Sequence, residues 1–115
     1  MMEKMVYLYH PVDDLKQALT FYRETLGYEE AWREGKHTAA LTIPGSTVRL
    51  LLEEDEKELG PGAVFLVNSV DEFHLEKNGT LTCLKEPFDI PPGRYAVYQD
   101  PSGNALRIID FSNES

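Results

Sequence analysis

The chain of 115 residues contains an internal repeat, which constrains its fold more than any single motif does. Two similar segments each predict the start of a helix. They are Val12-Asp13-Asp14-Leu15 and Val67-Asn68-Ser69-Val70. Around each of these segments, the pattern of apolar and turn residues predicts a strand, a helix and three further strands. The order βαβββ therefore occurs over about residues 4–54, the first module, and about residues 62–112, the second module.

Local signals set the expected bounds of these elements. In the first module, Asp14 is the expected N-cap and Gly27 the expected helix end. In the second module, Ser69 caps a helix that ends at Asn78-Gly79. The expected strands are 5–9, 28–33, 38–43 and 47–53 in the first module, and 63–67, 80–84, 94–99 and 105–111 in the second. Residues 86–93, which include three prolines, are expected to form a loop, and the acidic run 53–58 a connector.

A βαβββ module has one sheet and one helix, so its helix can cover only one face of that sheet. Two such modules can place their helices outside and turn the remaining sheet faces toward each other. The repeat therefore predicts an α+β fold in which 1–115 form a single domain with a curved, cup-shaped mixed sheet. The concave face of such a sheet would suit a small ligand.

Composition excludes several classes of function. The net charge of −9 argues against a nucleic-acid-binding protein and against binding to an anionic membrane surface. No apolar run approaches the ~20 residues that cross a bilayer, and no secretory signal is evident. The only cysteine, Cys83, is expected to be a half-buried strand residue, and a single cysteine fits a cytoplasmic location.

Two segments resemble the vicinal oxygen chelate superfamily, which includes glyoxalase I, extradiol dioxygenases, bleomycin-resistance proteins and fosfomycin-resistance enzymes. They are Val12-x-Asp14-Leu15-x-x-Ala18-x-x-Phe21-Tyr22-x-x-x-Leu26-Gly27 and Asp100-Pro101-Ser102-Gly103-Asn104. With the repeat, the resemblance covers nearly the whole chain. It implies a cup of about eight strands and a homodimer, and it allows several chemistries as well as plain binding.

The resemblance also implies where a metal would bind. Enzymes of the superfamily hold one divalent metal with His, Gln or Glu from the first and last strands of each module. Counting from shared landmarks places these positions at Tyr7, Arg49, Gly62 and Arg107, with Arg49 assigned by internal symmetry to Arg107. None of the four is an imidazole or a carboxylate, and arginine cannot become a ligand. We therefore expect no metal and no other cofactor.

The candidate ligand-binding residues are Tyr7, Trp32, His37, Arg49, Tyr98 and Arg107. The two arginines could bind a carboxylate or phosphate if both face the cup, or could pair with nearby acidic residues. The aromatic residues could stack on a flat or cationic ligand, or could be ordinary core residues. One tyrosine of the pair Tyr95 and Tyr98 should face the cup. His37 could act as a base near this wall.

These observations predict a metal-free small-molecule-binding protein, of the sequestering or resistance type. The alternative is a metal-dependent lyase, isomerase or dioxygenase of the superfamily, holding one divalent metal through residues not recognised by this count. A third possibility is a regulatory or assembly domain without a small-molecule ligand. The expected partners are a small molecule and a second copy of the chain, with no nucleic acid and no membrane.

Overall fold

The computed structural model describes residues 4–55, 59–77 and 79–114. Residues 6–62 form one compact unit, and the residues from Ala63 onward form another together with Lys4 and Met5. These units correspond to the first and second modules, which confirms the α+β class and the repeated βαβββ order. Part of the acidic connector, residues 56–58, and Asn78 at the expected helix end lie outside the described residues.

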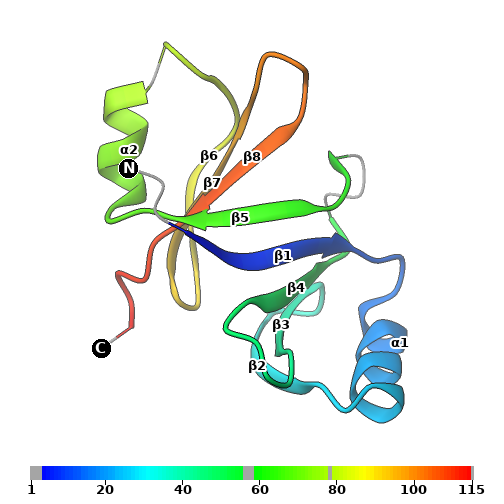
Figure 1. Cartoon of the computed structure of the whole chain (residues 1–115). Coiled ribbons are helices and arrows are strands. Elements are labelled where there is room, and N and C mark those ends of the chain that lie inside the picture. Colours follow the sequence, from blue (N-terminus) through cyan, green and yellow to red (C-terminus); the bar gives the residue numbers. More distant parts are fainter. Residues whose placement is uncertain (1–3, 56–58, 78, 115) are drawn as a thin grey trace. The chain divides into compact units, whose positions relative to one another are not determined.

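The first module contains β1 (Met5–Pro11), α1 (Leu15–Thr20), a π-helical turn η1 (Phe21–Thr25), β2 (Glu29–Glu34), β3 (Thr38–Thr42) and β4 (Arg49–Glu53). Strands β2, β3 and β4 form an antiparallel meander, and β1 pairs with β4 in parallel (Figure 1). The sequence predicted this meander from its short connections, because the loop between two antiparallel strands needs only a few residues.

Local capping and apolar spacing explain α1. The Oδ1 atom of Asp14 accepts a hydrogen bond from the backbone N–H of Gln17 at 3.0 Å, as expected of an N-cap. Leu15 and Leu19 lie on the buried face of the helix and pack against the leucines of β3 and β4. Gly27 follows η1 with a φ of +76°, a conformation that only glycine adopts easily.

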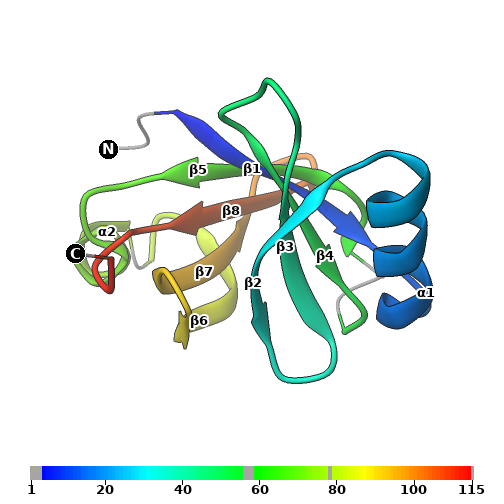
Figure 2. The same cartoon turned by 90° about the horizontal axis from the view of Figure 1, so that it is seen from below.

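The second module contains β5 (Gly62–Leu66), α2 (Val70–Lys77), β6 (Thr82–Ile90), β7 (Gly93–Gln99) and β8 (Ala105–Ile109). Strands β6, β7 and β8 are antiparallel, and β5 pairs with β8 in parallel (Figure 2). Ser69 caps α2 by accepting the N–H of Glu72 at 3.1 Å. Within the described residues, no helix is long and apolar enough to span a membrane.

The expected loop over 86–93 is wrong. Residues 86–90 continue the strand that the sequence placed at 80–84, because β6 runs from Thr82 to Ile90, and only residues 91–92 form a turn before β7. Two register shifts, one between Cys83 and Lys85 and one between Lys85 and Phe88, interrupt its pairing with β7. Pro87 lies within the second shift, where a proline does not remove a hydrogen bond of the ladder.

The same carboxylate contact ties the helix to the sheet in both modules. Glu54, directly after β4, accepts the N–H of Leu15 with its Oε2 atom at 2.6 Å. Asp110, directly after β8, accepts the N–H of Val70 with its Oδ2 atom at 2.8 Å. Leu15 and Val70 are the first residues of their helices, whose N–H groups have no partner within the helix.

This contact defines the true register of the repeat. Because Glu54 corresponds to Asp110, the counterpart of Arg107 is Leu51, and the counterpart of Arg49 is Ala105. The expectation that Arg49 and Arg107 are symmetric is therefore wrong by two residues. The alignment of turn residues that suggested it failed because the turns before β4 and β8 differ in length.

Asp110 is the more heavily used of the two carboxylates. It is 2% exposed, and its Oδ1 atom accepts the N–H of Arg94 at 2.9 Å and the hydroxyl of Ser112 at 2.7 Å. A Cβ atom at Gly93 would collide with the backbone oxygen of Asp110, so glycine is required where β7 begins. Burial raises the pKa of Asp110, but the hydrogen bonds from Ser112, Val70 and Arg94 outweigh it and lower the pKa overall.

We expect Asp110→Asn to lower the free energy of unfolding by about 2–4 kcal/mol, because an amide cannot accept at both ends and leaves buried N–H groups without acceptors. Urea denaturation at pH 7 measures this loss. Because the pKa is lower in the folded state, the native contribution is present above the unfolded pKa and is lost as the pH falls through the folded pKa.

The matched control is Asp89→Asn, which changes an exposed carboxylate that pairs with Arg94 at 3.1 Å. This control should lose no more than ~0.5 kcal/mol, because exposed ion pairs contribute little. An Asp110→Asn variant that is as stable as the control would contradict the anchoring role of Asp110.

Candidate functional site

The sheet of the first module has one face covered by α1 and one face turned away from it. Leu8, Leu50 and Leu52 lie on the α1 face. Tyr7 lies opposite Arg49 in the parallel register, and Tyr9 lies opposite Leu51. Because side chains alternate along a strand, these residues share the opposite face. We call this surface the open face of the first module, meaning only that α1 does not cover it. Tyr7, Tyr9 and Leu51 on this face are buried, whereas Arg49 is half-buried.

An aromatic pair stands on the open face. The indole Nε1–H of Trp32 donates a hydrogen bond to the hydroxyl of Tyr7 at 3.0 Å. The two rings meet edge to face, with centroids 6.1 Å apart and an interplanar angle of 74°. Tyr7 is 1% exposed, whereas Trp32 is only half-buried. The hydrogen bond and the ring contact fix both side chains, so the sequence-predicted residues Tyr7 and Trp32 are brought together.

Arg49 lies beside this pair. Its Cα atom is the register partner of Tyr7, and directly paired residues of neighbouring strands are about 5 Å apart. The Arg49 side chain is half-buried, and no hydrogen bond or ion pair joins it to another described residue. A guanidinium with available donors next to a fixed aromatic pair can bind an oxyanion on a planar molecule.

In the second module, Arg107 lies on the face turned away from α2. It is opposite Val64 on β5 and Val97 on β7, and it is fully buried. Arg107 interacts with other groups of the chain, as a buried charge must. Tyr95 shares this face with Val97 and Arg107. The centroid of its ring lies 5.4 Å from the centroid of the Phe88 ring.

The placement of Tyr98 differs from the prediction. Tyr98 packs with Phe73 in the core beneath α2, and its hydroxyl is 2.7 Å from Nδ1 of His74. Burial raises the pKa of Tyr98 to about 12, so the hydroxyl remains protonated. Strand parity puts Tyr95, and not Tyr98, on the face that carries Arg107. The sequence shows that Tyr95 and Tyr98 point to opposite faces of their strand. It does not show which of them shares a face with Arg107, because that depends on how β7 pairs with β8.

The placement of His37 also differs from the prediction. Its Nδ1 atom is 2.7 Å from Oε1 of Glu54, the carboxylate whose other oxygen accepts the first N–H of α1. This ion pair holds the His37 ring at the start of the helix, rather than beside Tyr7 and Trp32 on the open face. The hydrogen bond to Glu54 raises the pKa of His37.

The residues at the positions implied for a metal do not fit one. The structural register gives two sets of positions, offset by two residues on the same faces. Together they comprise Tyr7, Tyr9, Arg49, Leu51, Gly62, Val64, Ala105 and Arg107. Neither set supplies an imidazole or a carboxylate. Over the described ranges, no group of three or more His, Cys, Asp or Glu side chains could hold a metal ion.

Glu53 is the one carboxylate of β4 that shares the parity of Arg49 and Leu51. Its Oε2 atom accepts the hydroxyl of Thr38 at 2.5 Å. A single carboxylate without a second donor does not make a transition-metal site of the kind that the superfamily uses.

Residues 4–108 match the Glyoxalase/Bleomycin resistance protein/Dioxygenase superfamily. The chain belongs to this superfamily. An uncharacterized protein from Mycolicibacterium smegmatis is 35% identical over 107 residues, which cover 90% of this chain and 88% of that protein. The resemblance read from the two sequence segments is therefore confirmed.

Solved structures share the fold over nearly the whole chain. Methylmalonyl-CoA epimerase from Mycobacterium tuberculosis has a TM-score of 0.71 at 20% identity, covering 95% of this chain and 88% of that one. The Streptomyces coelicolor epimerase in complex with 2-nitronate-propionyl-CoA has a TM-score of 0.73 at 20% identity, with coverage of 97% and 99%. A superfamily member from Vibrio splendidus 12B01 has a TM-score of 0.60 at 20% identity, with coverage of 93% and 97%. At such identities the likeness shows the fold alone.

We expect the pKa of His37, measured by NMR titration, to lie above 6.5 and to fall toward that value in Glu54→Gln. Because the folded pKa is raised, the pair stabilises the fold fully below the unfolded pKa, and this contribution disappears as the pH rises through the folded pKa. Glu24→Gln is the control, since it removes a carboxylate elsewhere in the first module. A His37 titration that is identical in all three proteins would contradict the pairing.

Proposed function

We propose that this chain is a small-molecule-binding member of the superfamily that works without a resident metal, in a sequestering or resistance-type role. The observation that carries the proposal is the chemistry of the residues at the positions where its relatives would hold a metal. In either register these residues are aromatic, aliphatic, glycine or arginine. Such side chains suit the binding of an organic molecule and give a divalent cation no ligand.

The ligand class follows from the open face of the first module. Trp32, which the buried Tyr7 holds in place, offers a half-exposed aromatic surface, and Arg49 offers guanidinium donors beside it. We therefore propose a planar molecule that carries a carboxylate or phosphate group. The net charge of −9 would favour a cationic ligand at long range, but contacts within a few ångströms outweigh screened distant charges.

Two further proposals rest on the sequence alone. A homodimer is supported by the dimers that are common in the superfamily. It is also supported by the need to cover exposed sheet edges, whose N–H and C=O groups have no strand partner. A cytoplasmic location is supported by the single cysteine.

The absence of a resident metal is tested by elemental analysis. Protein purified without chelators should contain far less than one equivalent of any first-row transition metal, and dialysis against Zn²⁺, Mn²⁺, Fe²⁺ or Ni²⁺ should leave its melting temperature unchanged. A stoichiometric metal that survives gel filtration would contradict the proposal and would favour a metal-dependent lyase, isomerase or dioxygenase.

Binding at the open face is tested by fluorescence, because Trp32 is the only tryptophan of the chain. A planar carboxylate or phosphate that binds there should change the emission of Trp32 saturably. Arg49→Gln should weaken that binding about tenfold or more, because a charged hydrogen bond contributes about 1.5–3 kcal/mol. The control is Lys85→Gln on β6, which removes the same charge from the second module. Equal affinities of the native protein and Arg49→Gln for every ligand found would remove Arg49 from the site.

A further inference from the structure

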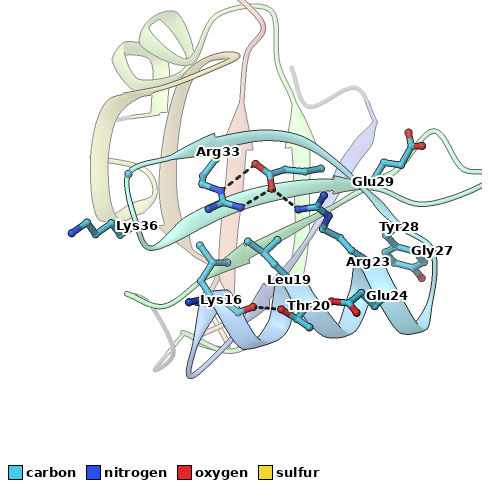
Figure 3. Close-up of a pocket in the computed structure, with 13 residues that line it drawn as sticks. Lys16, Leu19, Thr20, Arg23, Glu24, Gly27, Tyr28, Glu29, Arg33 and Lys36 are labelled. Carbon is cyan, nitrogen blue, oxygen red and sulfur yellow. Dashed lines mark hydrogen bonds and ion pairs between the residues drawn. The ribbon is translucent and has the colours of Figure 1, made fainter.

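A second cavity lies in the first module, on the α1 side of the sheet and away from the open face. It is a groove of about 1190 Å³ between the helical segments α1 and η1 and the edge strand β2. Leu19 reaches from α1 toward the strands, and an ion-pair cluster spans from strand to helix (Figure 3). The groove is lined by Leu15, Lys16, Leu19, Thr20, Arg23, Glu24, Gly27, Tyr28, Glu29, Glu30, Arg33, Gly35 and Lys36.

A β-bulge builds the strand side of the groove. Residues three apart in a regular strand point to opposite faces, but the register of β2 shifts between Glu30 and Trp32. The shift places both Glu30 and Arg33 on the α1 face, opposite Leu41 and Ala39, while Trp32 stays on the open face. Arg33 then forms a two-pronged ion pair, with its Nε and Nη2 atoms 3.1 and 2.7 Å from the Glu30 oxygens.

The π-helical turn builds the helix side. Arg23 lies in η1, and π-turns inside helices are frequent at functional sites. Its Nη1 atom is 3.6 Å from Oε1 of Glu30, which is an ion-pair distance and too long for a good hydrogen bond. Within the described part of the chain, the Arg23 guanidinium donates no hydrogen bond, and its side chain is 54% exposed. Its donors are therefore available to a ligand.

The charge of the groove is opposite to the charge of the chain. The lining holds four of the 11 basic residues but only three of the 20 acidic ones. At its centre, a single carboxylate, Glu30, faces two guanidinium groups, so cationic charge is in excess there. Lys16 stands two helical turns before Arg23, on the same side of the helix. Leu15 and Leu19 lie at the floor of the groove but are almost fully buried, and the half-buried ring of Tyr28 adds further apolar surface.

We propose that this groove is a second ligand site, for a small molecule with a carboxylate or phosphate group attached to an apolar segment. The anionic group binds between Arg23 and Arg33, and the apolar segment lies along the ring of Tyr28 and the exposed edge of Leu19. Glu30 positions both arginines and at the same time competes with the ligand for them. The site uses residues of the first module only and shares none with the open face.

NMR titration with two probes tests the site. Octanoate carries a carboxylate on an apolar chain, and phenyl phosphate carries a phosphate on a ring. At least one of them should shift the amide signals of Gly27 and Gly35 saturably at millimolar concentration, and the stronger of the two shows which combination of anionic group and apolar part the groove prefers. Benzyl alcohol, which is neutral, should not. An equal response to benzyl alcohol, or no saturable shift with either anion, would overturn the proposal.

Three variants test whether the charged residues of the groove control its affinity for the anionic probes. Arg23→Gln should weaken binding about threefold, as expected for exposed charges, whereas Glu30→Gln should tighten it by a similar factor because both arginines lose their internal competitor. Lys4→Gln, in the compact unit formed mainly by the residues from Ala63 onward, removes one positive charge and should leave the affinity unchanged. Equal weakening by Arg23→Gln and Lys4→Gln would show an effect of net charge alone and would overturn the site. In Arg49→Gln, the amide signals of Gly27 and Gly35 should respond to the probes as in the native protein, because these signals report the groove and not the open face. The groove and the open face therefore succeed or fail separately.

Discussion

The contact on which each module depends is the hydrogen bond from the first N–H of a helix to a carboxylate that follows the last strand. Glu54 makes it in the first module and Asp110 in the second. The N–H groups at the start of a helix need acceptors, and the helix dipole favours a negative charge there. Because the carboxylate also belongs to the end of a strand, the contact fixes the helix against its sheet and sets the register between the first and fourth strands. That register determines which side chains are neighbours on the sheet face away from the helix.

This register explains why the residues at the metal positions have the same chemical character although one position was counted wrongly. The symmetry partner of Arg107 is Leu51 and not Arg49, so the sequence count was two residues off in one strand. A shift of two residues keeps every side chain on the same face of the sheet. Both sets of residues lack imidazole and carboxylate groups, and the conclusion therefore does not depend on choosing between them. A shift of one residue would have exchanged the faces and removed the argument.

The sequence predicted what local chemistry determines. The caps at Asp14 and Ser69 and the glycine after the first helix were correctly placed, because each acts on neighbours within a few residues. The sequence did not predict features that depend on distant partners. Tyr98 is held under α2 by His74, and His37 is held by Glu54, although both were predicted from the sequence as candidate ligand-binding residues. The strand β6 passes through a proline because its pairing with β7 is interrupted there, and no signal in 82–90 marks that interruption.

Both candidate sites of the first module depend on one irregularity of β2. The bulge between Glu30 and Trp32 sends Trp32 to the open face, where it bonds to Tyr7, and sends Glu30 and Arg33 together to the groove. If these same residues paired regularly, without a bulge, Glu30 and Arg33 would lie on opposite faces, and either the indole or one member of the ion pair would be misplaced. A bulge of this kind changes the chemistry of two surfaces while leaving the strand order of the fold intact. Proteins that share this fold can therefore differ in what they bind through the presence or position of a bulge in an edge strand, which is consistent with the variety of chemistries that one fold supports.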